Sequence, residues 1–155
     1  MKRLVLSFIF LCLPTIVLTA NLTMDQSTEK IKAAAKGLLF MSESDYPLDV
    51  FIPDTQPAGS ITDIVILDWA QKQSGSPIEK QELAYFFRNQ VRDLPEHGSE
   101  EKGRAERFRN LQKVLQEELI DVTVYRVGTT QITALIIGKT KAGNYAGLKT
   151  TLIET

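Results

Sequence analysis

The sequence contains only one cysteine and one histidine among its 155 residues. Cys12 lies in an apolar N-terminal run that we expect to be removed, so the mature chain would have no disulfide and no thiol chemistry. His97 stands in a polar segment with no nucleophile or orienting partner assignable from spacing, which argues against catalysis. One histidine without cysteine also excludes the usual zinc sites. Glu117 and Glu118 are adjacent on a predicted helix and are expected on its solvated surface.

The first twenty residues have the layout of a secretory signal peptide. Lys2 and Arg3 form a basic start, residues 4–18 are almost wholly apolar, and small residues lead to Ala20. The alternative is a retained membrane anchor. A span of the bilayer needs about 20 apolar residues, and this run is shorter and contains Pro14. We therefore expect cleavage near Ala20 and export to the periplasm or the exterior.

The remaining 135 residues, 21–155, are enough for one domain with its own core. Of the 18 basic residues, Lys2 and Arg3 are lost, so 16 remain against 19 acidic ones, a formal net charge of −3. A mildly acidic chain is a poor candidate for direct nucleic-acid binding. It is better suited to a protein partner with a basic cleft, and we expect a monomer when it is free, without membrane contact.

Hydrophobic periodicity predicts helices early in the chain and strands in its last third. Apolar residues spaced by three and four from Ala105 to Leu119 predict a long helix. Strands are expected at 121–127 and 131–139 around a hairpin turn at Gly128, and a third runs from 144 to the final residue. Earlier segments favour helices at 25–36, 62–73 and 82–88, and a strand at 48–52. In the second of these helices, Ile64–Leu67 is equally good strand sequence, so a strand is the alternative there. The pattern predicts an α/β fold with helices packed on an antiparallel sheet.

Two short segments are unusual. Leu38–Met41 is fully apolar and is expected in the core, and the acidic segment 42–47 follows it as a polar loop on a rigid base. A plain solvated turn is the ordinary alternative. At the other end, the carboxylate and hydroxyl of a terminal Thr155 can close one chelate ring on a hard cation such as Mg²⁺ or Mn²⁺. The ordinary alternative is a final residue without a role.

Segment 37–47 (GLLFMSESDYP), followed by Val50-Phe51, resembles the opening motif of the cyanobacterial nuclease A inhibitor family. The resemblance covers about residues 30 to 155, nearly the whole expected mature chain. Its later matches are shorter, at Phe86-Phe87, Val124-Tyr125-Arg126, Ile137-Gly138, Ala142-Gly143-Asn144-x-Ala146-Gly147 and Glu154-Thr155.

The resemblance implies a three-layer α/β/α sandwich with a mostly antiparallel central sheet and three consecutive C-terminal strands. It implies a 1:1 inhibitor of a secreted, non-specific DNA and RNA endonuclease of the ββα-metal type, without enzymatic activity or a cofactor of its own. Thr155 would ligate the catalytic Mg²⁺ or Mn²⁺ of the nuclease, and Glu43 would meet its basic groove. The other expected partner-binding residues are Ser42, Ser44, Asp45, Glu96 and Glu154.

The chain departs from the family pattern in two ways. Gap-free counting from Phe87 to Phe108 places Pro95-Glu96 where the family has an Asp-Trp contact pair, so the kind of aromatic anchor that often dominates an interface is missing. The family prototype is also cytoplasmic, without a signal peptide. The alternative function is an exported binding module of the same fold with a non-nuclease partner. A hydrolase is the least supported function, because the sequence offers no catalytic set.

The export hypothesis predicts the N-terminus of the released protein. Sequencing of the secreted chain by Edman degradation or mass spectrometry should give a start near Asn21, because the small residues before it suit a signal peptidase. Recovery of full-length chain from the membrane fraction would instead show a retained anchor.

Overall fold

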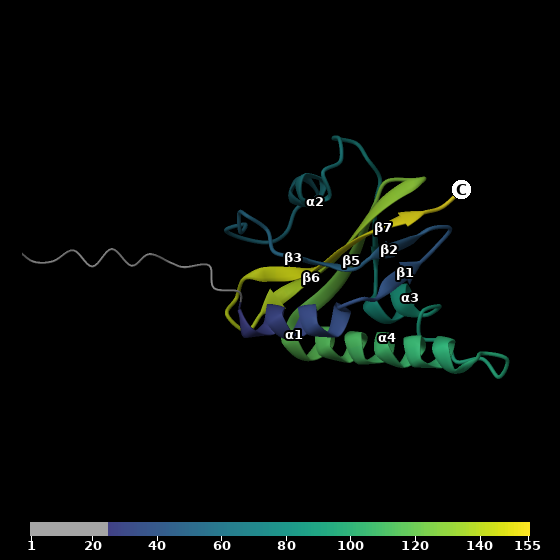
Figure 1. The fold of residues 1–155 in the computed structure, drawn as a ribbon. Coiled ribbons are helices and arrows are strands. Elements are labelled where there is room, and N and C mark those ends of the chain that lie inside the picture. The colour runs from purple at the N-terminus through teal and green to yellow at the C-terminus, as the bar shows by residue number, and fades with distance from the viewer. Residues whose placement is uncertain (1–24) are drawn as a thin grey trace, which may run out of the picture.

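The computed structural model describes residues 25–155, and the predicted signal segment 1–20 lies outside the described residues. Figure 1 shows helices and strands arranged around one main sheet. In chain order the elements are α1 (Gln26–Ala35), β1 (Leu39–Met41), β2 (Asp45–Pro47), β3 (Asp49–Phe51), α2 (Asp63–Ala70), β4 (Ile78–Gln81), α3 (Leu83–Phe87), α4 (Ser99–Glu118), β5 (Leu119–Val127), β6 (Gln131–Thr140) and β7 (Tyr145–Ile153).

The main sheet has five strands in the order β3-β7-β6-β5-β4, and every neighbouring pair is antiparallel. The strands β1 and β2 form a separate two-stranded hairpin. The predicted mixture of helices with an antiparallel sheet is confirmed. The hairpin between β5 and β6 is also found, and Gly128 takes a positive φ of 115° at its turn, where a side chain would be strained.

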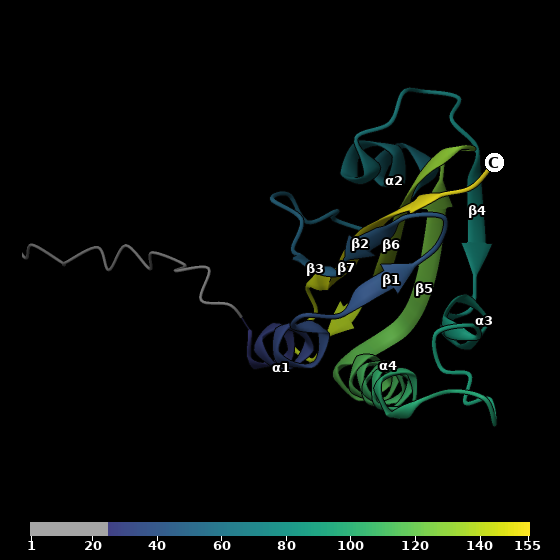
Figure 2. The same cartoon turned by 45° about the vertical axis from the view of Figure 1, so that its right-hand side comes forward.

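Alternation along the strands divides the core into two clusters on opposite faces of the sheet. Val124 and Ile136 face α1, α3 and α4, which contribute Ile31, Phe87 and Leu111 among others. The intervening Tyr125, Leu135 and Ile137 face α2, with Ile66 and Trp69. The two views show α2 on one side of the sheet and the other helices across from it (Figures 1 and 2). Between residues 25 and 155, no helix is long and apolar enough to cross a membrane.

The long helix is confirmed as α4, whose 20 residues span roughly 30 Å at 1.5 Å per residue. Its buried positions include Ala105, Phe108, Leu111 and Leu115, the three- and four-residue spacing that the sequence displays. The ambiguous segment 62–73 forms α2 rather than a strand. Thr62 stabilises its start, because the Thr62 side chain accepts a hydrogen bond from the backbone N–H of Val65 at 3.4 Å.

The apolar run Leu38–Met41 is only half buried, contrary to the prediction. Leu38 and Phe40 are in the core, but Leu39 and Met41 are 46% and 42% exposed. The cause is strand geometry, since successive side chains of β1 point to opposite sides. The segment expected as a loop is also shorter, because Asp45–Pro47 pairs with β1 as β2. The acidic residues therefore lie at the tip and on one strand of a hairpin.

The predicted solvated position of Glu118 is wrong. Glu118 is 6% exposed and receives a hydrogen bond from Ser27 at 3.0 Å and an ion pair from Lys30 at 2.6 Å. Lys141 adds a longer ion pair at 3.6 Å. These contacts tie α1 to the end of α4. The hydrogen bond from Lys30 is the largest cause that holds the pKa of Glu118 below its ordinary value, while burial opposes it.

A lowered folded-state pKa means that Glu118 stabilises the protein above its unfolded-state pKa, and that this stabilisation is lost as pH falls through the folded-state pKa. Glu118→Gln should therefore lower the free energy of unfolding at pH 7 more than in acid below about pH 4. Urea unfolding at both pH values tests this. Glu117→Gln is the matched control, because that side chain is 57% exposed. An equal effect of Glu118→Gln at both pH values would contradict the prediction.

Candidate partner-binding site at the hairpin tip and C-terminus

The hairpin tip and the last residue of the chain are in direct contact, although 112 positions separate them. The Glu43 carboxylate accepts two hydrogen bonds from Thr155 through the same oxygen, Oε1. The backbone N–H of Thr155 donates at 3.0 Å and its hydroxyl at 2.7 Å. Both residues are exposed. The structure thus brings together the two residues that the sequence singled out separately.

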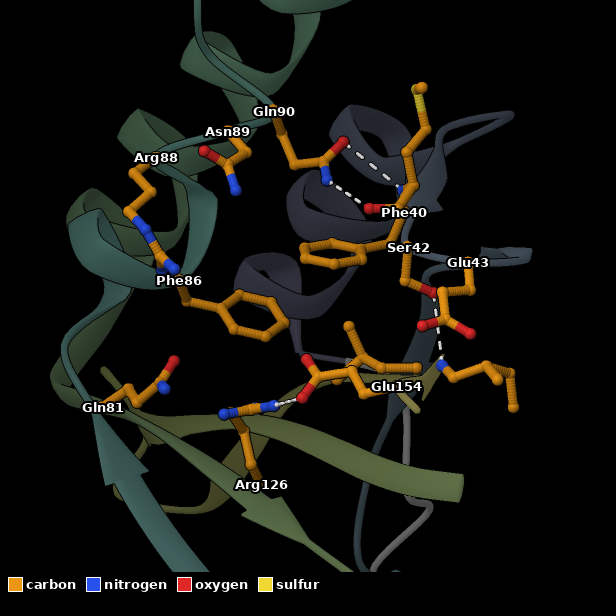
Figure 3. Close-up of a pocket in the computed structure, with 13 residues that line it drawn as sticks. Phe40, Ser42, Glu43, Gln81, Phe86, Arg88, Asn89, Gln90, Arg126 and Glu154 are labelled. Carbon is orange, nitrogen blue, oxygen red and sulfur yellow. Dashed lines mark hydrogen bonds and ion pairs between the residues drawn. The ribbon is translucent and has the colours of Figure 1, made fainter. Parts of the chain in front are cut away.

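Ser42 joins the hairpin to the end of β7. Its Oγ accepts from the backbone N–H of Ile153 at 3.2 Å and donates to the carbonyl of Ser44 at 2.8 Å. The backbone N–H of Glu43 donates in turn to the carbonyl of Ile153 at 3.4 Å. Figure 3 shows the link from Ser42 to the strand end. These bonds set the position of Glu43 before any partner is present.

Gln90 fixes the other edge of β1. Its side-chain amide donates to the carbonyl of Met41 at 2.8 Å, and its oxygen accepts from the Met41 N–H at 3.4 Å. Gln90 is buried, so it pairs the strand edge much as a neighbouring strand would. The ring of Phe40 beside it stacks on Phe86 with centroids 4.6 Å apart. The base of the hairpin is therefore held by both polar and aromatic contacts.

Beyond β7, Glu154 is held by Arg126. One guanidinium nitrogen of Arg126 lies 2.6 Å from the Glu154 carboxylate, and another lies 2.5 Å from Glu79 on β4. The Arg126 side chain is only 15% exposed, whereas both carboxylates are more than half exposed. The backbone N–H of Glu154 also donates to the carbonyl of Thr130 at 3.0 Å. The predicted strand to the final residue stops at Ile153, but these bonds hold the residue that follows.

A cavity of about 280 Å³ lies between the hairpin, α3 and the strand ends. Figure 3 shows Phe86 and Arg126 pointing into it from different elements, with Glu154 at its rim. Its lining combines two acidic residues, two arginines, amides and an apolar floor: Phe40, Met41, Ser42, Glu43, Gln81, Phe86, Arg88, Asn89, Gln90, Arg126, Leu152, Ile153 and Glu154.

The other residues predicted to bind the partner differ in how close they lie to the contact between Glu43 and Thr155. Ser44 is at the hairpin tip, and Asp45 is exposed on β2, opposite Met41. Glu96 is exposed in the connection between α3 and α4, and no hydrogen bond or ion pair within 25–155 joins it to Glu43 or Thr155. Sequence reasoning missed Gln90, Arg126 and Glu79. The available signal was a charged Arg126 between Tyr125 and Val127, two residues that are buried in the strand.

The described part of the chain has no group of three or more His, Cys, Asp or Glu side chains arranged to hold a metal ion. The oxygen atoms of Thr155 and Glu43 are hard ligands of the kind that Mg²⁺ prefers. They could complete a coordination shell that another molecule provides, but they do not form a shell alone.

The fold and this surface define an antiparallel α/β protein that presents an acidic hairpin beside the end of its chain. The family model described as nuclease A inhibitor-like protein matches residues 25–155, and the chain belongs to this family. A search of curated proteins gives no match. The resemblance seen in the sequence is therefore confirmed at the level of the family, whose description indicates inhibition of a nuclease.

Proposed function

We propose that this chain is an exported inhibitor of a non-specific, metal-dependent DNA and RNA endonuclease of the ββα-metal type. The observation that carries the proposal is the pair of hydrogen bonds from Thr155 to Glu43. They unite the acidic hairpin and the end of the chain into one exposed unit. Family membership supplies the class of partner, because the family is described as nuclease A inhibitor-like.

The charge of this unit suits a cleft built for phosphates. Glu43, Asp45 and Glu154 are all exposed at this end of the molecule. Only Oε1 of Glu43 is used by Thr155, which leaves Oε2 for a basic side chain of the partner. A carboxylate held by its neighbours loses little conformational freedom on binding, so more of its interaction energy contributes to affinity.

Thr155 is suited to occupy the metal of the partner. When it is the final residue, it offers a hydroxyl and an α-carboxylate, which are oxygen ligands of the type that Mg²⁺ and Mn²⁺ accept. Its hydroxyl proton is directed to Glu43, so the lone pairs of that oxygen remain available. We infer that these two oxygens take positions meant for substrate phosphate on the nuclease metal.

The proposed inhibitor has the three-layer α/β/α scaffold of the family, with its last three strands consecutive. It is a monomer that binds one nuclease molecule in a 1:1 complex. Helices against both faces of the sheet and the neighbouring strands β5, β6 and β7 support that scaffold. Ser42 and Ser44 shape the hairpin tip, and Glu96 would contact the partner further from the metal. Cleavage near Ala20 would place the inhibitor in the periplasm or outside the cell.

Extending the chain by one glycine after Thr155 is the direct test of metal capping. The extension converts the terminal carboxylate into an amide and moves the new terminus away from the metal. With a ββα-metal nuclease of the same organism, the parent should block DNA cleavage and the extended chain should inhibit far less.

Two substitutions refine this test. Thr155→Ser keeps the hydroxyl and should retain most of the inhibition, whereas Thr155→Val should lose more. If the extended chain inhibits as well as the parent, capping is wrong and the protein acts by covering the cleft. If the parent does not inhibit any such nuclease, the partner is of another class.

Glu43→Ala should weaken nuclease binding by roughly 2–5 kcal/mol, the range for truncating one member of a buried, hydrogen-bonded charge pair at an interface. The melting temperature should hardly change, because Glu43 is exposed and its side chain accepts hydrogen bonds from Thr155, at the exposed end of the chain. Calorimetric titration and thermal unfolding measure the two effects.

Glu43→Gln separates charge from position. Its amide oxygen still accepts from Thr155, so any role in positioning survives while the charge is lost. We expect Glu43→Gln to lose nearly as much nuclease binding as Glu43→Ala. Full binding by the Gln variant would mean that Glu43 only orients Thr155.

A further inference from the structure

We propose that Arg126 is the positioning residue that aims the last two residues of the chain, and that its ion pair with Glu154 holds Thr155 in a binding-ready orientation. This inference rests on the proposed function and names a residue that acts through Glu154 rather than through contact with the nuclease. Arg126 also forms an ion pair with Glu79 on β4, which does not contact the last two residues.

The three side chains lie on one face of the sheet. Glu79 and Arg126 are direct partners in the β4–β5 register. Glu154 continues the alternation of Leu148 and Leu152, which belong to the cluster under α1 and α4. Arg126 therefore reaches across β6 to the strand end, where it lies 2.6 Å from Glu154 (Figure 3). On its own side of the sheet it lies 2.5 Å from Glu79.

The backbone hydrogen bonds between β6 and β7 do not by themselves fix the last two residues of the chain. The register of β6 with β7 ends at Gln131 and Ile153. After it, the bond from the Glu154 N–H to the Thr130 carbonyl joins backbone to backbone. The side chains of Arg126 and Glu43 then hold Glu154 and Thr155, one residue each. Glu154 and Thr155 are thereby fixed by side chains from two different elements, β5 and the β1–β2 hairpin.

A purely stabilising role explains the arrangement less well. Glu79 and Glu154 are 59% and 52% exposed, and ion pairs of exposed carboxylates contribute little to folding free energy. A planar, forked guanidinium is instead suited to hold two carboxylates in a fixed geometry. Arg126 is itself largely buried, so its position is set by the sheet and is passed on to Glu154.

Side chains that orient a metal ligand typically change metal affinity or activity by about 10- to 100-fold when they are removed. Arg126→Met, which keeps an apolar stem of similar length, should therefore weaken nuclease inhibition by about 10-fold or more. Glu79→Gln is the matched control. It removes the other ion pair of Arg126 but leaves the bond to Glu154, and should inhibit nearly as well as the parent.

A double-mutant cycle separates positioning from contact. In the chain extended by one glycine, Thr155 no longer offers its terminal carboxylate, so Arg126→Met should cause little further loss. An equal loss in both backgrounds would overturn the inference, because Arg126 would then contact the partner or support the fold. Arg126→Lys, which keeps the charge without the fork, should restore part of the inhibition.

A measurement on the free protein keeps this result distinct from failure of the proposed function. The ¹⁵N heteronuclear NOE of the amides of Glu154 and Thr155 should fall in Arg126→Met and remain high in Glu79→Gln, with equal urea midpoints for both. Unchanged NOE values in Arg126→Met would overturn the inference even if the parent inhibits. Absence of inhibition by the parent would instead refute the proposed function, while the NOE values still report on Arg126.

Discussion

The antiparallel pairing of β6 with β7 is the interaction on which both the fold and the candidate site depend. It runs from Gln131 opposite Ile153 to Lys139 opposite Tyr145. Its register is tightly set at Gly147, where a Cβ atom would lie 1.7 Å from the carbonyl oxygen of Ile136. Because a slip by one residue would turn every side chain to the other face, this register places Leu148 and Leu152 in the core. The same register delivers Ile153 to Ser42 and Thr155 to Glu43.

Several exposed carboxylates lie close together at the candidate site, although exposed ion pairs add little to the stability of the fold. Glu79 and Glu154 both pair with the largely buried Arg126, Glu43 lines the same cavity as Arg126, and all three carboxylates are exposed. Arg126 carries one positive charge for the two carboxylates that it pairs with, so this group keeps a net negative charge. The apolar floor beneath these charges belongs to the core, since Phe40, Phe86 and Leu152 are members of one core cluster and also line the cavity. Such a local charge imbalance is typical of a surface that is completed by a basic partner.

The sequence allowed the fold to be predicted where local periodicity was strong. The spacing from Ala105 to Leu115 defined α4, and Gly128 between two apolar segments defined the β5–β6 hairpin. Prediction from periodicity failed for β2, whose three residues form a strand only through pairing with β1. It also failed for Glu118, because the partners Ser27 and Lys30 lie about 90 positions away. Single-sequence periodicity contains no information on such distant pairs.

The same limit applies to the site. Glu43 and Thr155 were identified by resemblance, but their mutual hydrogen bonds depend on the sheet register, which the sequence does not display. Arg126 was part of a matching motif, yet its ion pair with Glu154 depends on strand pairing that brings the end of β7 within its reach. Glu96, placed by counting alone, remains without a link to the centre formed by Glu43 and Thr155.

Without an aromatic residue at that position, the proposed inhibitor must gain affinity in other ways. The structure offers two. Exposed carboxylates near a basic cleft accelerate association, and residues held before binding lose little entropy when the complex forms. Met41, 42% exposed and two residues before Glu43, can add apolar contact area. Preorganised charge at Glu43, Glu154 and Thr155 therefore has to contribute the share of binding that an aromatic anchor supplies in other interfaces.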